Sequence, residues 1–147
     1  MNRLQEKVLG FMDENDPVIF PEISLRKIFT TIYLSEEPIS IQSIASITGL
    51  SLASVSNKAK ELVHMGILQK HSKPGSRELF LKTNYSLSQV LQVHTEQKIR
   101  VIEEQQVHLK KLVEILSGST KDRAQSLLDD SHRLIRAHQK LIEELKK

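Results

Sequence analysis

Residues 38–56 read PISIQSIASITGLSLASVS and predict two short helices joined by a tight turn. Apolar residues recur at helical spacing up to Thr48. Gly49 then ends the first helix, because glycine adopts the left-handed conformation without steric cost. Ser51 is a good N-cap for a second helix, which we expect to run to Met65. This second helix has a stripe suited to burial, made by Val55, Ala59, Leu62 and Val63.

Two short strands are expected directly after these helices. Gly66 stops the second helix, and residues 67–71 and 78–82 have strand composition around a Pro-Gly-containing turn at 72–77. A hairpin that directly follows a helix-turn-helix is a wing. Two amphipathic helices are also expected before residue 38. They span 2–15 and 23–34, and a proline-containing break follows each of them.

Positive charge is concentrated on the segment that contains the second helix and the hairpin. The chain has a formal net charge of +3, but residues 1–50 carry a net −3 and residues 51–84 a net +4. Because DNA is a polyanion, this distribution favours double-stranded DNA as the partner.

The outward side chains of the helix that begins after Ser51 suit the major groove, because small and hydrogen-bonding groups let a helix approach the base edges. We expect Asn57 to read a base, since an amide donates and accepts at once. The hairpin tip, with Arg77, is expected to follow the backbone into the minor groove. The expected DNA contacts are Ser51, Ala53, Ser54, Ser56, Asn57, Lys58, Lys60, Lys73, Ser76 and Arg77.

The run at 38–56, together with Leu62, GIL at 66–68 and KPGSRELF at 73–80, resembles the MarR-type winged-helix regulators, most closely their GbsR-like branch. The resemblance implies a sequence-specific transcriptional regulator, which we expect to be a repressor acting as a homodimer. Many MarR proteins carry an aspartate two residues before the wing arginine, where this chain has Gly75. The ligand-binding role of some GbsR-like proteins therefore does not transfer by residue.

From residue 87 onward the sequence predicts two long amphipathic helices, at 88–116 and 121–145, with a Ser/Gly-rich break between them. Apolar positions in the last helix recur at three and four residues and form a seam that needs a partner helix. An intrachain hairpin without a dimer is the alternative, although it would leave one apolar face uncovered. The residues expected to build a homodimer are Leu127, Leu128, Leu134, Ile135, Leu141, Ile142 and Leu145.

These patterns predict a mainly α fold with a small β wing, that is, a winged helix-turn-helix domain plus long C-terminal dimerisation helices. We place the DNA-binding domain with its N-terminal helices at 1–86 and the helical dimerisation region at 87–147. No apolar run approaches the ~20 residues that span a bilayer, and no signal peptide is evident. We therefore expect a cytoplasmic protein without membrane contact.

Other site chemistries find little support in the sequence. Without cysteine there is neither a disulfide nor a thiolate metal site. The six histidines suggest a metal site shared across a dimer, with His94 and His108 or His132 and His138 as ligands. Neither pair has the i, i+4 spacing that brings two imidazoles onto one metal ion. Phosphate-binding glycine loops, zinc-protease motifs and nucleophile elbows are missing too. We expect no metal, no cofactor and no catalysis.

Two other functions are also compatible with the sequence. The chain could be a winged-helix module that assembles a protein complex without touching DNA, although a basic hairpin tip beside a Ser/Asn helix face favours DNA. An unidentified small-molecule effector could also lie between the helices, although apolar aromatics at helical spacing also suit a core. The residues around that effector would be Phe11, Phe20, Phe29 and Tyr33.

Overall fold

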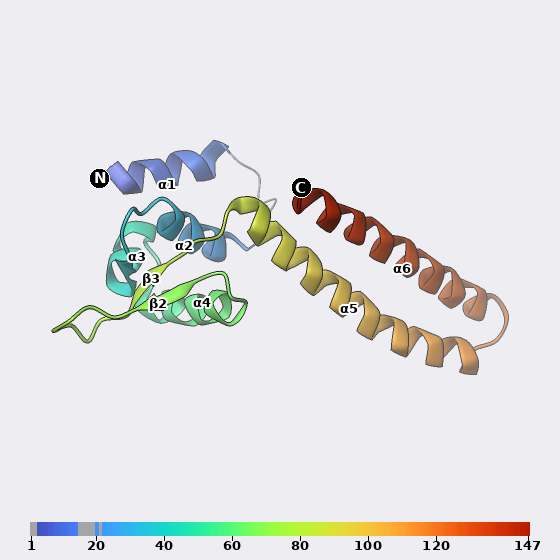
Figure 1. The fold of residues 1–147 in the computed structure, drawn as a ribbon. Coiled ribbons are helices and arrows are strands. Elements are labelled where there is room, and N and C mark those ends of the chain that lie inside the picture. The colour runs from blue at the N-terminus through green and yellow to red at the C-terminus, as the bar shows by residue number, and fades with distance from the viewer. Residues whose placement is uncertain (1–2, 15–19, 21) are drawn as a thin grey trace. The chain divides into compact units, whose positions relative to one another are not determined.

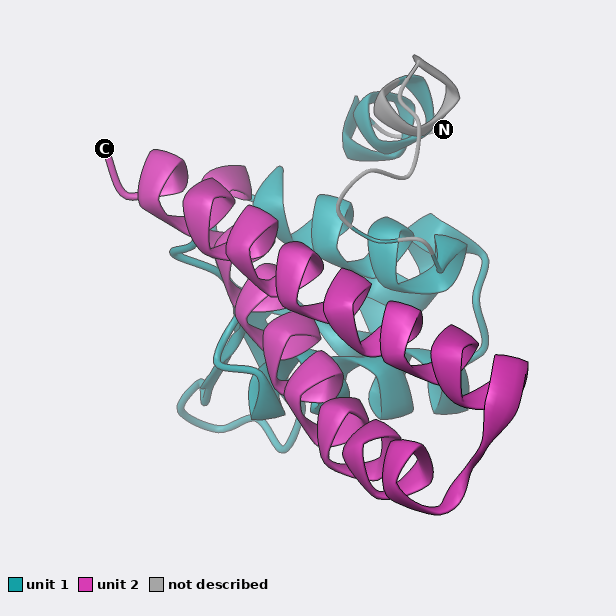
Figure 2. Ribbon diagram, turned by 90° about the vertical axis from the view of Figure 1, so that its right-hand side faces the viewer, with its two compact units in different colours: residues 1–86 teal, residues 87–147 magenta. Residues whose placement is uncertain are grey.

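The computed structural model describes residues 3–14, 20 and 22–147, without the side chains of residues 11–14. Within these ranges the chain forms six helices and a three-stranded sheet (Figure 1). It divides into two compact units, Met1–Ser86 and Leu87–Lys147 (Figure 2). The fold is mainly α with a small β wing and two long C-terminal helices, as the sequence predicts.

The first unit contains four helices and all three strands. Its helices are α1 (Arg3–Glu14), α2 (Ile23–Tyr33), α3 (Ile41–Thr48) and α4 (Leu52–His64). Its strands are β1 (Ile39–Ser40), β2 (Gln69–His71) and β3 (Phe80–Lys82). The helices lie where the sequence predicts them. On α1, Val8 is buried, and the side chains of Phe11 and Met12 lie outside the described residues.

The sheet is antiparallel in the order β1-β3-β2, with Lys70 opposite Leu81 and Ile39 opposite Leu81 on the other side. The predicted strands at 67–71 and 78–82 are longer than the observed ones. The amides of Ile67 and Leu68 both donate hydrogen bonds to the carbonyl of Leu62 near the C-terminus of α4. They therefore do not take part in the hydrogen bonds between the strands. The loop between β2 and β3 extends away from the helices of this unit (Figure 1).

Helix α2 forms the centre of the first unit's core. It packs against α1, α3, α4 and β3. The core is made mainly of aliphatic side chains, and it includes the aromatic rings of Phe20, Phe29 and Phe80. Its most deeply buried large side chains are those of Ile28, Phe29, Ile32, Ile44, Val55, Leu62, Ile67 and Leu81. This core fixes α3, α4 and the sheet against one helix, so the surface that they present has a defined shape.

The second unit is an antiparallel pair of helices, α5 (Leu87–Ile115) and α6 (Gly118–Leu145), which lie side by side (Figures 1 and 2). Between them the buried amide of Gln106 donates a hydrogen bond to the Ser131 hydroxyl at 2.9 Å. Helix α6 begins three residues earlier than the sequence predicts. No helix in the described ranges is both long and apolar enough to cross a membrane.

Candidate nucleic-acid interface

Three local features fix the turn between α3 and α4. The Ser40 hydroxyl caps α3 by accepting a hydrogen bond from the Ser43 amide at 3.1 Å. Gly49 ends α3 with φ 73°, in the left-handed region that glycine adopts freely. The Ser51 hydroxyl then caps α4 by accepting a hydrogen bond from the Ser54 amide at 3.1 Å. The predicted helix-turn-helix is therefore present, with the predicted glycine and serine in those positions.

One face of α4 is open to solvent along the length of the helix. The opposite side is buried in the core of the unit through Val55, Ala59 and Leu62. The centre of the open face repeats every three or four residues and contains Ala53, Asn57, Lys60 and His64, and the exposed Glu61 borders it on the side of Lys58. No described residue forms a hydrogen bond with the Asn57 amide, so its donor and its acceptor are both available to a base edge.

His64 belongs to this open face, and the sequence interpretation missed it. It lies two helical turns after Asn57, and this spacing was the signal that could have found it. The serines at the start of α4 are placed differently from one another. The Ser51 oxygen is occupied as the cap, whereas Ser54 and Ser56 are half-buried at the edges of the open face.

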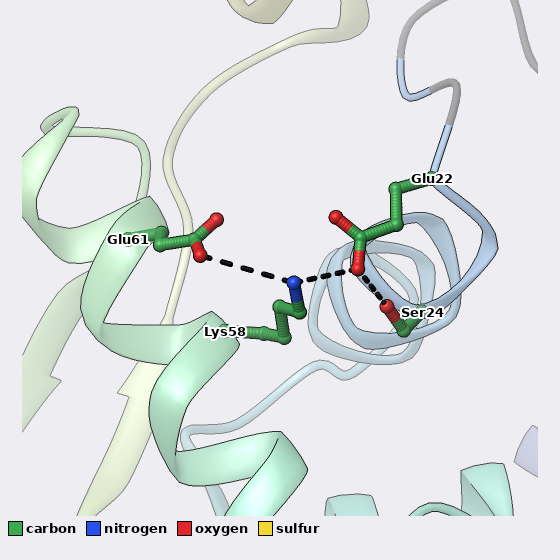
Figure 3. A network of polar contacts seen from close by, with 4 residues as sticks. All are labelled: Glu22, Ser24, Lys58 and Glu61. Carbon is green, nitrogen blue, oxygen red and sulfur yellow. Dashed lines mark hydrogen bonds and ion pairs between the residues drawn. The ribbon is translucent and has the colours of Figure 1, made fainter.

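Lys58, which the sequence predicts as a DNA contact, lies on a flank of α4 and is half-buried. Position 58 is about 100° around the helix from Asn57. The Lys58 ammonium lies 2.6 Å from a carboxylate oxygen of Glu22, the residue that precedes α2, and 3.8 Å from one of Glu61 (Figure 3). The Ser24 hydroxyl donates to the same Glu22 oxygen at 2.7 Å. The charge of Lys58 is therefore already paired.

This ion pair shifts the titration of both partners. The hydrogen bond from Lys58, and then that from Ser24, lower the pKa of Glu22. The hydrogen bond to Glu22 raises the pKa of Lys58. Both shifts favour the charged forms, so the pair is fully ionised near neutral pH. The Lys58 and Glu22 side chains remain 25 % and 47 % exposed, and water screens the attraction between them.

The tip of the wing is a tight turn. The Ser76 amide donates to the Lys73 carbonyl at 3.1 Å, which places Pro74 and Gly75 at the two central positions. Gly75 has φ 76°, as a type II turn requires at its second central residue. The Ser76 hydroxyl accepts a hydrogen bond from the Glu78 amide at 3.1 Å. Ser76 thus shapes the tip, and its hydroxyl hydrogen remains available to donate.

The two cationic side chains of the tip are placed differently. Arg77 is exposed and forms no ion pair or side-chain hydrogen bond within the described ranges, so its guanidinium can reach a phosphate. The Lys73 ammonium lies 4.2 Å from the centre of the Phe80 ring, in a cation–π contact that draws it toward the base of the wing. Of these two cations, Arg77 is therefore the one that is free to bind a phosphate.

The apolar seam predicted on α6 is divided between two faces of the helix. Leu128 is buried and shares the face of Ser131, which meets α5 through Gln106. Three of the predicted dimer residues are half-buried on this inner face, and they are Ile135, Ile142 and Leu145. The other face carries exposed leucines at one-heptad intervals. They are Leu127, Leu134 and Leu141, with exposures of 56 %, 50 % and 39 %. Half of the seam thus serves the intrachain hairpin, and the other half lacks a partner among the described residues.

Of the aromatic residues considered for an effector site, Phe20 and Phe29 belong to the core, whereas Tyr33 is 44 % exposed. Phe20 and Phe29 are each 2 % exposed, and their ring centres lie 5.2 Å apart. The Tyr33 ring stacks on the Phe29 ring, with 5.7 Å between the ring centres. The side chain of Phe11 lies outside the described residues. In the part of the chain that the structure describes, no group of three or more His, Asp or Glu side chains is placed to hold a metal ion.

No protein-family model matches the sequence, and comparison with curated proteins gives no match. One solved structure, described as a transcriptional regulator, is similar with a TM-score of 0.63 and 15% sequence identity, over 97% of this chain and 93% of that chain. A protein from Mycobacterium tuberculosis has a TM-score of 0.37 at 18% identity, over 69% of this chain and 68% of that chain, and supports no conclusion. The first likeness shows that this chain shares its fold with a transcriptional regulator.

Proposed function

We propose that this chain binds double-stranded DNA sequence-specifically and regulates transcription. The observation that carries this proposal is the combination, within one unit, of an open α4 face around Asn57 and an exposed wing tip with a free Arg77. The major groove of B-DNA, about 12 Å wide, admits an α-helix. A hairpin beside that helix can follow the adjacent backbone into the minor groove.

Each part of the proposed interface has a distinct role. Asn57 reads a base edge, while Lys60 and Arg77 bind phosphates and fix the register of the protein on the duplex. His64 extends the open face by one turn and joins the proposed contacts. The motifs at 38–56 and 73–80 support a MarR-type regulator of the GbsR-like branch, and we propose that it acts as a repressor, without catalysis and without a metal or cofactor.

We also propose that the regulator is a homodimer that uses the exposed stripe Leu127, Leu134 and Leu141. Leu112 of α5 lines the same shallow cavity as Leu127, so the apolar surface spans both helices. Contiguous exposed apolar surface of this kind marks interaction sites. A second copy suits it, because a two-fold dimer carries two winged units that can occupy half-sites about 34 Å apart.

A selection from fragments of the source genome tests this proposal. The purified chain should enrich a small set of fragments that share one motif, present as two half-sites about one helical turn apart or a multiple of that. Recovery that does not exceed a protein-free control would contradict DNA binding. The winged helix would then be better explained as a module that assembles a protein complex.

A further inference from the structure

We infer that Glu22 lowers the affinity of this chain for DNA, and that it does so by holding Lys58 away from a phosphate of the bound duplex. The inference rests on the proposed function, because it concerns the flank of the same helix α4. It adds a residue from outside the helix-turn-helix and the wing, since Glu22 precedes α2. It also means that Lys58 binds a phosphate only by giving up its ion pair with Glu22, because its charge is not free.

The position of Lys58 determines what this lysine can contact. A helix in the major groove points one stripe at the bases, and its flanks face the two phosphate backbones that form the groove walls. In α4 the stripe contains Asn57 and Lys60, and Lys58 projects to one side of it. A lysine on that flank is a suitable partner for a phosphate, but here its ammonium is bound 2.6 Å from Glu22.

The polar groups around Lys58 oppose the approach of a phosphate. Glu22 is held in place from two sides, by Lys58 at 2.6 Å and by the Ser24 hydroxyl at 2.7 Å. Glu61 adds a second carboxylate 3.8 Å from the same ammonium (Figure 3). One cation and two carboxylates leave this flank net negative. A duplex must therefore displace Glu22 before Lys58 can bind a phosphate, and the lost ion pair weakens the observed affinity.

A double-mutant cycle on Glu22 and Lys58 tests this mechanism. The variants are Glu22→Gln, Lys58→Met and the two combined, and the probe is a short fluorescent duplex of random sequence, titrated by anisotropy at several salt concentrations. Glu22→Gln should tighten binding about two- to fivefold, the range that exposed ion pairs provide. Lys58→Met should weaken binding and reduce the salt slope by about one. In the Lys58→Met background, Glu22→Gln should have no further effect.

Two controls separate this mechanism from simpler effects. Glu37→Gln removes the same charge from an exposed residue between α2 and β1, and should leave the affinity unchanged. Thermal unfolding should show that every variant is folded, as expected for side chains that are partly exposed in the wild type.

Either of two results would overturn the inference. One is unchanged affinity in Glu22→Gln, and the other is tightening that persists in the Lys58→Met background, which would be a general charge effect. A wild-type chain that binds no duplex at all would instead contradict the proposed function, and the inference with it.

Discussion

Asn57 lies in the middle of the open face of α4 and carries the proposed base reading. Asn57→Ala should weaken binding to the selected operator by roughly 1–3 kcal/mol, because an amide that pairs with one base edge through two hydrogen bonds is lost. Affinity for random duplex DNA, measured by the same anisotropy titration, should barely change. Equal losses on both DNAs would make Asn57 a backbone contact and would give α4 a different register in the groove.

Gly49 should be sensitive to substitution for a backbone reason alone. A Cβ at this position would meet no atom within 4 Å, but φ is 73°. An L-residue in the left-handed region costs about 1–2 kcal/mol, so Gly49→Ala should lower the free energy of unfolding in urea by about that amount.

Gly10→Ala is the matched control, because position 10 is inside α1 and is equally open. Alanine in a helix interior is more favourable than glycine by roughly 0.5–1 kcal/mol, so this control should raise stability instead. A neutral Gly49→Ala would mean that the turn between α3 and α4 readjusts.

At the scale of elements, the two faces of α6 predict two different mutant phenotypes. Leu134→Asp should dissociate the homodimer in sedimentation velocity and leave the monomer folded, because this side chain is already 50 % exposed in one chain. Its carboxylate would be desolvated only in the dimer. Leu128→Ala should instead lower the free energy of unfolding by about 2–4 kcal/mol, since this side chain is 7 % exposed.

A Leu134→Asp variant that remains dimeric would show that the dimer interface lies elsewhere, with the N-terminal helices as the first alternative. Conversely, a Leu128→Ala variant that dissociates without loss of stability would exchange the roles of the two faces.

The sequence predicts the helices of this fold well because their ends carry chemical signals. Ser51 and Gly66 mark the two ends of α4, and the wing follows from Pro-Gly between short apolar runs. Strand β1 could not be predicted, because two residues show no periodicity. The seam on α6 is ambiguous for a physical reason, since an intrachain hairpin and a dimer need the same three- and four-residue spacing.

The candidate site is less predictable because its contacts join distant parts of the chain. Helical spacing places Asn57 and Lys60 on the open face, and would have placed His64 there too. The pairing of Lys58 with Glu22 leaves no local pattern, because the two residues belong to different elements. Likewise, the position of Lys73 over Phe80 depends on how the hairpin folds back.

At the scale of the whole molecule, assembly and DNA affinity should be coupled. One winged unit reads a single half-site, whereas a dimer holds its second unit at high effective concentration near the other half-site. The dissociated Leu134→Asp variant should therefore bind the operator much more weakly than the wild type, and should retain the weak affinity for random DNA that a single unit provides.

The salt dependence of binding to duplex DNA, compared between the wild type and Arg77→Ala, tests most directly whether the open face of α4 and the wing bind DNA. Wild-type affinity should fall steeply with salt, and Arg77→Ala should bind every sequence more weakly, with a slope smaller by about 0.9 for the lost phosphate contact. Lys111→Ala, which removes one exposed charge from α5, should match the wild type. Equal affinities and slopes for Arg77→Ala and the wild type would contradict the contact of the wing, and wild-type binding that is insensitive to salt would contradict DNA binding through this surface as a whole.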